Sequence, residues 1–154
     1  MIELKRILIA TDFSDHARVA FRHALGIAQA FKSELILLHV LELNDMLSQL
    51  PPIGENYFSP ALTQAQEDHV KHLGEEWLKE CGEVKARFLT RQGSPFLEIL
   101  ATAKDEDVDL LVVGTHGRGM IAHMLMGSVA EKIVRKARCP VLTVREGEHE
   151  FVHP

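Results

Sequence analysis

Apolar residues along the chain form four short continuous runs and one alternating stretch. The continuous runs cover residues 7–10, 35–40, 110–113 and 141–144, and the alternating stretch covers residues 84–88. A short apolar run is typical of a strand that is buried on both faces of a parallel sheet, whereas alternation is typical of a strand with one exposed face. The pattern therefore predicts five strands, with the third at an edge of the sheet.

Between these strands, apolar residues recur at intervals of three and four, which predicts four amphipathic helices. We expect the helices to begin after Ser14, near Pro60, near Pro95 and at Ser128. Serine is a good helix N-cap, and proline is well tolerated in the first turn of a helix. Ser128 is followed three positions later by Glu131, which is the pattern of a capping box.

Two segments fall outside this alternation of strands and helices. Residues 41–59 contain two consecutive prolines and predict a connection that is unusually long for a compact α/β unit. Residues 146–154 are polar and predict a loosely held tail. We therefore expect one domain over residues 1–145, followed by the tail.

The alternation itself predicts an α/β fold with a single doubly wound, parallel, five-stranded sheet. With the strand order 3-2-1-4-5, right-handed crossovers place the first two helices on one face and the last two on the other. The order reverses between the first and the fourth strand, and open α/β sheets bind ligands at the carboxyl ends of the strands at such a point. Asp12 follows the first strand and Gly114 follows the fourth, so we expect a binding site between them.

A loop rich in glycine connects the fourth strand to the last helix. Gly114, Gly117 and Gly119 lie in this loop, and Gly127 comes immediately before Ser128. Glycine lets the backbone approach a ligand closely, and the free N–H groups at a helix N-terminus bind anions. We therefore interpret the loop as a cradle for phosphate rather than as a surface turn.

This cradle differs from the two best-known nucleotide-binding loops. Gly114 and Gly119 have the spacing of a P-loop, but Met120 stands where the P-loop requires lysine. Residues 117–122 spell G-x-G-x-x-A, yet they follow the fourth strand, and no acidic residue lies about twenty positions further on. A dinucleotide fingerprint is therefore not expected.

Composition and charge narrow the class of protein. The chain has 154 residues, of which 46% are hydrophobic and 25% charged, and its formal net charge is −5. A nucleic-acid binder would carry a basic face, so that class is not expected. No apolar run approaches the length of a membrane span. Cys81 and Cys139 lie far apart and no signal-peptide pattern precedes the first strand, so we expect a reducing cytoplasm.

Patterns of catalytic or metal-binding residues are weak. There is no G-x-S-x-G elbow, no Cys–His signature and no lysine in the cradle for phosphoryl transfer. His69 and His72 lie three positions apart on a predicted helix and His123 follows in the loop, but a further zinc ligand is missing nearby, so a polar surface is the preferred interpretation. We interpret His39, near the end of the second strand, as a core histidine with its hydrogen bonds satisfied. A phosphate site without such residues is expected to act as a binding switch.

Three separated motifs resemble those of the universal stress protein family, specifically of its ATP-binding members. The loop fits the family pattern G-x2-G-x9-G-S/T, which is filled here by Gly114, Gly117, Gly127 and Ser128. Residues 5–12 (KRILIATD) and 139–144 (CPVLTV) also match, so the resemblance covers nearly the whole chain. It implies a Rossmann-like fold and a regulatory or stress-response module that binds ATP together with Mg²⁺.

The resemblance also assigns contacts to the nucleotide. Asp12 would meet the ribose hydroxyls or the adenine amine, or attract the Mg²⁺ that the phosphates carry; otherwise Asp12 simply caps the helix that follows. The backbone of Ala10 and Thr11 would assist Asp12, and Val40 would line the adenine pocket. Ser128 is expected both to cap its helix and to contact phosphate. The other predicted nucleotide-binding residues are Val113, Gly114, His116, Gly117, Arg118, Gly127 and Val129.

Two alternative functions remain open at this stage. The chain could be a slow ATPase or a phosphoryl- or nucleotidyl-transfer enzyme, or it could act without nucleotide as a dimeric protein that binds a partner. The intact glycine pattern argues against the second alternative. The resemblance further implies a signalling partner and a homodimer formed through the last strand, which comprises Val141, Leu142, Thr143 and Val144.

Overall fold

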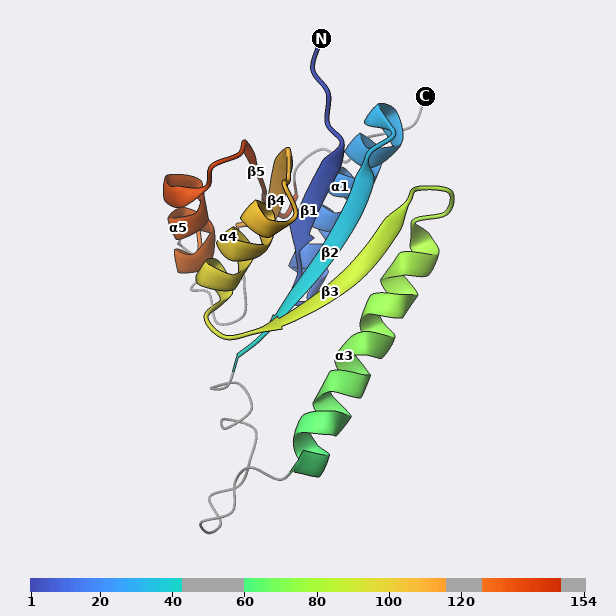
Figure 1. The fold of residues 1–154 in the computed structure, drawn as a ribbon, viewed down its shortest axis with the longest axis vertical. Helices are drawn as coiled ribbons and strands as arrows, with labels where there is room; N and C mark the ends of the chain where they lie inside the picture. Colours follow the sequence, from blue (N-terminus) through green and yellow to red (C-terminus); the bar gives the residue numbers. More distant parts are fainter. Residues whose placement is uncertain (43–59, 116–125, 148–154) are drawn as a thin grey trace.

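The computed structural model describes residues 1–42, 60–115 and 126–147 of the chain (Figure 1). Strands and helices alternate in it as the sequence predicts. In chain order the elements are β1 (Arg6–Ala10), α1 (Asp15–Phe31), β2 (Glu34–Leu41), α3 (Pro60–Glu80), β3 (Ala86–Gln92), α4 (Pro95–Asp105), β4 (Leu110–Gly114), α5 (Ser128–Lys136) and β5 (Val141–Val144).

All five strands lie in one parallel sheet with the order β3-β2-β1-β4-β5, which confirms the predicted topology. β1 is central, with Ile9 opposite Leu37 of β2 and Val112 of β4. Because the order reverses between β1 and β4, the carboxyl ends of these two strands meet at the predicted switch point. This carboxyl end of the sheet is the lower end in Figure 1.

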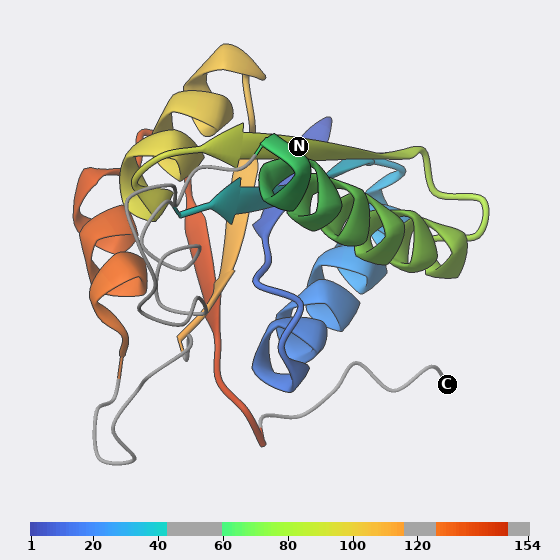
Figure 2. The ribbon, with the colours of Figure 1, turned by 90° about the horizontal axis from the view of Figure 1, so that it is seen from below.

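The helices cover the two faces of the sheet in the predicted pairs, α1 with α3 and α4 with α5 (Figure 2). Ile7 and Ile9 of β1 point into the core beneath α1 and α3, whereas Leu8 points into the core beneath α4 and α5. All three side chains are fully buried. Both faces of the central strands therefore need apolar residues, which is why these strands are continuous apolar runs. Within the described ranges, no helix is long and apolar enough to cross a membrane.

The edge strand β3 begins and ends later than the alternating pattern indicates. It covers Ala86–Gln92 rather than residues 84–88. Phe88 packs against the α1/α3 core and Leu89 against the α4/α5 core. Because both faces of this part of β3 are covered, alternation alone underestimates how far the strand extends.

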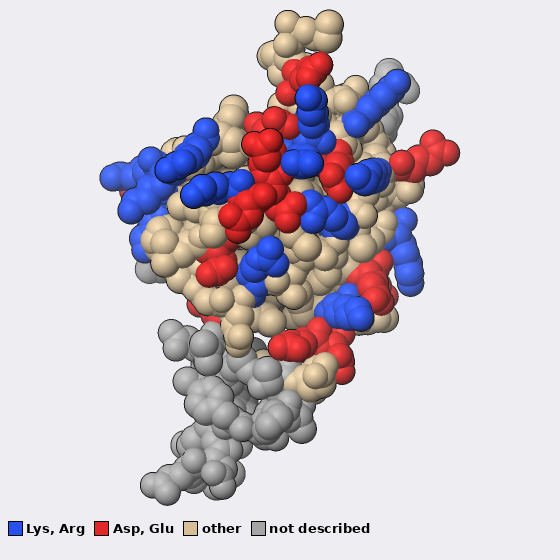
Figure 3. Space-filling view, in the orientation of Figure 1, with Lys and Arg blue, Asp and Glu red and all other residues tan. Residues whose placement is uncertain are grey.

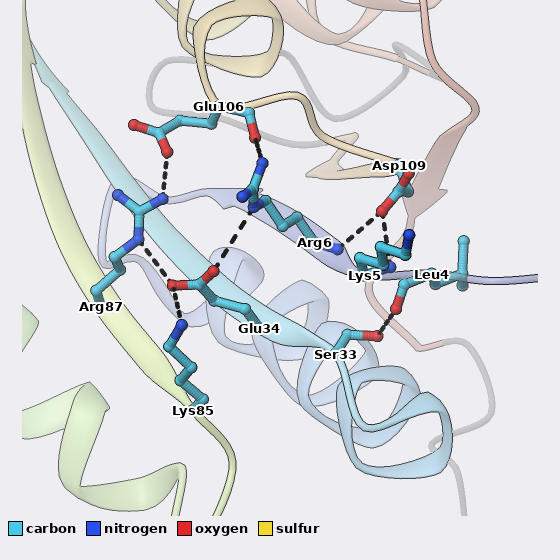
Figure 4. A network of polar contacts seen from close by, with 9 residues as sticks. All are labelled: Leu4, Lys5, Arg6, Ser33, Glu34, Lys85, Arg87, Glu106 and Asp109. Atoms are coloured by element: carbon cyan, nitrogen blue, oxygen red, sulfur yellow. Dashed lines mark hydrogen bonds and ion pairs between the residues drawn. The ribbon is translucent and has the colours of Figure 1, made fainter.

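Glu34, the first residue of β2, lies at the centre of a charged network at the amino end of the sheet (Figure 4). Its carboxylate lies 3.0 Å from Arg87 Nε, 3.4 Å from Lys85 Nζ and 3.7 Å from Arg6 Nε. Arg87 also donates to the carboxylate of Glu106. The network thus connects β1, β2 and β3 with the residue that follows α4.

Electrostatics within this network favour ionised carboxylates. Burial acts to raise the pKa of Glu34, but the hydrogen bond from Arg87 and the charges of Lys85 and Arg87 outweigh it and hold the pKa below its ordinary value. The hydrogen bond from Arg87 likewise lowers the pKa of Glu106. Acidic and basic side chains are interspersed over this part of the surface (Figure 3).

The start of β1 is held at the same end of the sheet by three hydrogen bonds that involve the side chains of Asp109 and Ser33 (Figure 4). One oxygen of Asp109 accepts hydrogen bonds from the backbone N–H of Lys5 at 2.7 Å and of Arg6 at 2.9 Å. The hydroxyl of Ser33 donates to the carbonyl of Leu4. At the amino end of the sheet, the polar side chains described here are therefore paired with other groups of the same chain.

Candidate functional site

The turn from β1 to α1 is held by short polar side chains that bond to the backbone just ahead of them. Thr11 is buried, and its Oγ1 accepts a hydrogen bond from Phe13 N at 2.9 Å. Asp12 Oδ1 accepts from Ser14 N at 2.9 Å, and Ser14 Oγ accepts from Ala17 N at 3.2 Å. Contacts of this kind are the reason why threonine, aspartate and serine favour turns and helix caps.

Ser14 is the N-cap of α1, as predicted, and Asp15 in the first turn complements the helix dipole. Asp12 bonds to the N-cap residue rather than to an amide of the helix, so its carboxylate stabilises the turn and does not cap α1. A carboxylate has about four acceptor positions, and the bond to Ser14 takes one of them. The partly exposed carboxylate of Asp12 can therefore hold the turn and accept from a ligand at the same time.

The loop after β4 is closed at its base by one hydrogen bond. Thr115 is 2% exposed, and its N–H donates to the carbonyl of Val144 at 2.9 Å. The carbonyl of Thr115 accepts from Gly127 N at 2.7 Å, which holds the two ends of the segment 116–126 together beside Gly114. Sequence reasoning missed Thr115, because a threonine that follows an apolar strand has no distinguishing pattern.

The predicted capping box at Ser128 is wrong. The N-cap of α5 is Gly127, whose backbone is extended (φ −68°, ψ 158°), and Ser128 is the first helical residue. An N-cap needs this non-helical backbone, so the serine stands one position too late to fill the role. The Glu131 side chain does not reach back either, but pairs with Arg135 at 2.8 Å.

Because glycine stands at the N-cap, the positive end of α5 has no side-chain cap from that residue. Among the described residues, no side chain caps this helix end, whose first N–H groups belong to Ser128 and Val129. The φ of Gly127 is one that any residue can adopt, so glycine is not needed here for its backbone freedom. What glycine provides is the absence of a side chain that would bond to these N–H groups itself or obstruct an anion.

Three of the predicted nucleotide contacts share one apolar cluster on the α4/α5 face. Ala10 at the end of β1, Val40 near the end of β2 and Val129 in the first turn of α5 are partly buried and pack against the same core. Val113 belongs to that core and is 3% exposed, so only its backbone can reach a ligand. Three further predicted residues lie outside the described residues: His116, Gly117 and Arg118.

An aromatic cluster supports the β1–α1 turn from the opposite face of the sheet. Phe13 adopts φ 60°, in the left-handed region, and its ring centroid lies 5.2 Å from those of His39 and Trp77 and 5.9 Å from that of Phe88. His39 Nδ1 lies 2.8 Å from the carbonyl oxygen of Thr11, which confirms the predicted hydrogen bonding of this histidine, although its side chain is partly buried rather than in the core. The sequence did not reveal this cluster, because its members come from four separate segments.

The histidines considered as zinc ligands lie on the surface of α3. His72 Nε2 lies 3.5 Å from Glu76, and His69 is exposed, which agrees with the preferred interpretation of a polar surface. His123 lies outside the described residues. Within the part of the chain that the structure describes, no group of three or more His, Cys, Asp or Glu side chains is placed to hold a metal ion.

Known proteins resemble this chain over nearly its whole length. Residues 3–145 match the Universal stress protein family. A universal stress protein of Thermus aquaticus is 37% identical over 142 residues, which cover 92% of this chain and 98% of the relative. Universal stress protein MJ0577 of Methanocaldococcus jannaschii is 32% identical over 155 residues, which cover 92% of this chain and 94% of the relative.

Solved structures share the fold. The structure of MJ0577 matches with a TM-score of 0.80, covering 96% of this chain and 100% of that chain. Two more distant structures contain nucleotides. One is a universal stress protein in complex with cAMP (TM-score 0.68, 23% identity, 94% and 98% of the two chains covered). The other is the universal stress protein from Archaeoglobus fulgidus in complex with dAMP (TM-score 0.62, 19% identity, 93% and 98% covered).

Proposed function

This chain belongs to the universal stress protein family, and we propose that it binds an adenine nucleotide, ATP in particular, as a regulatory module of the stress response. The observation that carries the proposal is the uncapped N-terminus of α5, which lies at the carboxyl end of the sheet together with Asp12. Relatives that share the fold hold cAMP and dAMP, which supports an adenine nucleotide as the class of ligand.

The phosphates would lie at the N-terminus of α5. The backbone N–H groups of Ser128 and Val129 are the donors there, and the helix dipole favours negative charge at this end. Gly114 and Gly127 would let the phosphates approach the backbone of the two loop ends. The residues proposed from the family pattern to complete the cradle are His116, Gly117 and Arg118.

The nucleoside would lie across the ends of β1 and β2. Asp12 would accept hydrogen bonds from the ribose hydroxyls or the adenine amine, next to the backbone of Ala10 and Thr11. Val40 would offer an apolar surface to the base. Support comes from the apolar cluster that Ala10 and Val40 share with Val129, because it connects the nucleoside end with the phosphate end of the site.

Mg²⁺ would enter with the nucleotide. The ion usually keeps several waters and binds one or two carboxylates together with substrate phosphates. Asp12 is the carboxylate of the β1–α1 turn, and its remaining acceptor positions suit such a ligand or its waters. When bound, the ion would neutralise phosphate charge, while Asp12 and the N–H groups of α5 orient the nucleotide.

We also propose that two copies of the chain pair through β5. This strand is outermost in the sheet and pairs with β4 along one side, so its other side is available to a second copy. Val141, Leu142 and Thr143 are partly exposed in the single chain. Light scattering should give twice the mass of the 17.3 kDa chain, and a single-chain mass at every concentration would contradict the dimer.

The state of the cysteines supports a cytoplasmic location for this module. Cys81 and Cys139 are both free. Burial raises the pKa of the Cys81 thiol to about 11 and also raises that of Cys139. Unpaired thiols of low reactivity suit a reducing compartment. Cell fractionation tests the location.

Two measurements test nucleotide binding. Chromatography of the material released on denaturing the purified protein should reveal an adenine nucleotide, and calorimetric titration with Mg-ATP, AMP and cAMP should rank their affinities. Gly114→Val should weaken binding. An empty protein with no measurable affinity for any of the three would refute the proposal and move the function to the dimer surface.

Phosphate release that Asp12→Ala abolishes while ATP still binds would favour a slow ATPase.

A further inference from the structure

We propose that His39 is a positioning residue for the nucleotide site, which it serves by holding the β1–α1 turn on both sides of Asp12. The inference rests on the proposed nucleotide-binding function and adds a residue that does not touch the ligand. His39 contacts Thr11 through a hydrogen bond and Phe13 through its ring. These are the two residues that flank Asp12 in the chain, so His39 holds the backbone from which the Asp12 side chain projects.

The contact with Thr11 fixes the tautomer of His39. Its Nδ1 lies 2.8 Å from the carbonyl oxygen of Thr11. A carbonyl oxygen can only accept, so Nδ1 carries the proton and donates it. This donor state exists in the neutral Nδ1–H tautomer and also in the charged ring, so the contact survives either protonation state.

The hydrogen bond from His39 continues the pairing of β1 with β2 beyond the last residue of β1. The register of the two strands ends with Ala10 opposite Leu38, and Thr11 N still donates to the carbonyl of Leu38 at 2.9 Å. At the next position the donor to the Thr11 carbonyl is the side chain of His39. The chain thereby stays attached to β2 while its backbone turns away from the sheet toward α1.

The contact with Phe13 supports a strained residue. Phe13 has φ 60°, which is unfavourable for a residue with a side chain and persists only where the surroundings hold it. Its ring packs against those of His39 and Trp77, and its N–H donates to Thr11 Oγ1. The ring of His39 lies against one side of Phe13, while its hydrogen bond to the Thr11 carbonyl holds the backbone of the turn, so loss of that hydrogen bond lets the turn relax to ordinary backbone angles.

Val40, the neighbour of His39, shows that the two faces of β2 have different roles at this end. Val40 packs on the α4/α5 face with Ala10, where the nucleoside is proposed to lie. Successive side chains of a strand point to opposite faces, so His39 acts from behind the turn, against the ring of Phe13, which in turn contacts Trp77 and Phe88. Two consecutive residues of β2 thus have different proposed roles: His39 positions the turn, and Val40 contacts the nucleoside.

Three substitutions of His39 separate the hydrogen bond from packing. Asparagine can place an amide N–H near the position of Nδ1, glutamine places it further out near Nε2, and leucine offers no donor. We expect His39→Leu and His39→Gln to weaken Mg-ATP binding roughly tenfold, the usual worth of one hydrogen bond that is lost. His39→Asn should keep the affinity within about threefold of wild type. Calorimetry measures the affinities, and thermal melts are recorded for each variant.

His23 supplies the matched control. Its Nδ1 also lies 2.9 Å from a backbone carbonyl, that of Val19, but this contact is inside α1 and away from the turn. His23→Leu should lower the melting temperature at least as much as His39→Leu and leave the affinity for Mg-ATP unchanged. A second readout is the fluorescence of Trp77, the single tryptophan of the chain, whose ring contacts Phe13. His39→Leu should shift its emission in the protein without nucleotide, and His39→Asn should not.

The outcomes distinguish this inference from the proposed function. If wild type binds Mg-ATP and His39→Leu binds it equally well, the positioning role is refuted and the nucleotide site stands. If His39→Asn is as weak as His39→Leu, or if His23→Leu loses as much affinity, the effect is one of general stability and the positioning role is again refuted. If wild type binds no nucleotide, the proposed function fails, and the role of His39 toward a nucleotide fails with it.

Discussion

The two helices that begin at the switch point differ in how their N-termini are satisfied. α1 follows β1 and is capped by the side chain of Ser14, with Asp15 in its first turn. α5 follows β4, the neighbouring strand, and its N-cap is Gly127, which has no side chain to offer. The N-cap position is therefore filled by a hydrogen-bonding side chain at α1 and by a glycine, which has none, at α5.

This difference supports the orientation that we propose for the nucleotide. An anion gains most from a helix end whose N–H groups and dipole are not already compensated. At α1 the hydroxyl of Ser14 and the charge of Asp15 provide that compensation, which favours α5 as the position of phosphate in the proposed site. The turn before α1 instead presents the Asp12 carboxylate, which suits the hydroxyl and amine donors of a nucleoside.

Capping the N-terminus of α5 with a side chain should produce the largest change in the affinity for Mg-ATP. Gly127→Asp places a carboxylate where it can cap the helix and repel phosphate, so we expect the affinity for Mg-ATP to fall roughly 100-fold. The neutral variant Gly127→Ser can cap without the charge and should cost roughly tenfold. Neither variant should lower the melting temperature, because both residues are good N-caps. Undiminished affinity in Gly127→Asp, measured by calorimetry, would show that phosphate does not lie at this helix end.

A variant far from both helix ends provides the reference for stability. Glu34→Gln weakens the charged network at the amino end of the sheet and should lower the free energy of unfolding by about 1–2 kcal/mol at neutral pH. The affinity for Mg-ATP should not change, because the network lies at the opposite end from the proposed site. Urea unfolding and calorimetry measure the two quantities, and a loss of affinity would mean that the ends of the sheet are coupled.

The same network predicts how stability depends on pH. The pKa values of Glu34 and Glu106 are lowered in the folded protein, so their contribution is present above the ordinary carboxyl pKa and is lost as the pH falls through the lowered values. Wild type should therefore lose more stability than Glu34→Gln between neutral pH and about pH 3. Equal losses in urea unfolding would show that other carboxylates govern the response to acid.

Removing the side-chain cap of α1 tests whether this helix end serves stability rather than nucleotide binding. Ser14→Ala removes the side-chain cap and should lower the free energy of unfolding by about 1 kcal/mol, the typical worth of such a cap. Mg-ATP affinity should change less than about threefold, because the phosphates are proposed to lie elsewhere. Ser14→Asp, which can still cap, should restore stability in thermal melts. A larger loss of affinity than of stability would place Ser14 in the site.

Among these substitutions, Ser128→Ala is expected to have the smallest effect on Mg-ATP affinity and stability taken together. Because this serine is the first helical residue and not the cap, Ser128→Ala should leave the melting temperature unchanged. Loss of a hydroxyl that donates to phosphate should weaken Mg-ATP binding roughly fivefold. A drop in melting temperature without a drop in affinity would restore the capping interpretation and remove the phosphate contact.

Much of the fold could be predicted from the sequence, because buried parallel strands and amphipathic helices leave periodic patterns. β1 and β4 are continuous apolar runs, and the alternation of strands with helices leads to the sheet order that the structure has. The start of α1 could also be predicted, since Ser14 has the chemistry of a cap and the right position. The residues on either side of the switch point follow directly from that topology.

Contacts between distant segments could not be predicted in the same way. The bond from His39 to Thr11 and the packing of Phe13 on Trp77 depend on how the strands and α3 come together, and no local spacing reports that. The capping box predicted at Ser128 is wrong, because the N-cap of α5 is Gly127. A serine followed by a glutamate three positions later has the capping-box pattern whether or not the backbone of the serine is extended. A pattern of residue types does not contain the backbone angle that decides the cap.

The hydrogen bond between Thr115 and Gly127 has a consequence for protein engineering. It joins the two ends of the segment 116–126 across the end of β4, so the sheet and α5 determine where that segment leaves and where it returns. The entropic cost of closing a loop grows only slowly with its length, and insertions are best tolerated where the flanking backbone is already anchored. The segment can therefore be exchanged for the corresponding stretch of a relative while the scaffold stays intact, and the proposed phosphate site predicts that such an exchange changes the ligand preference.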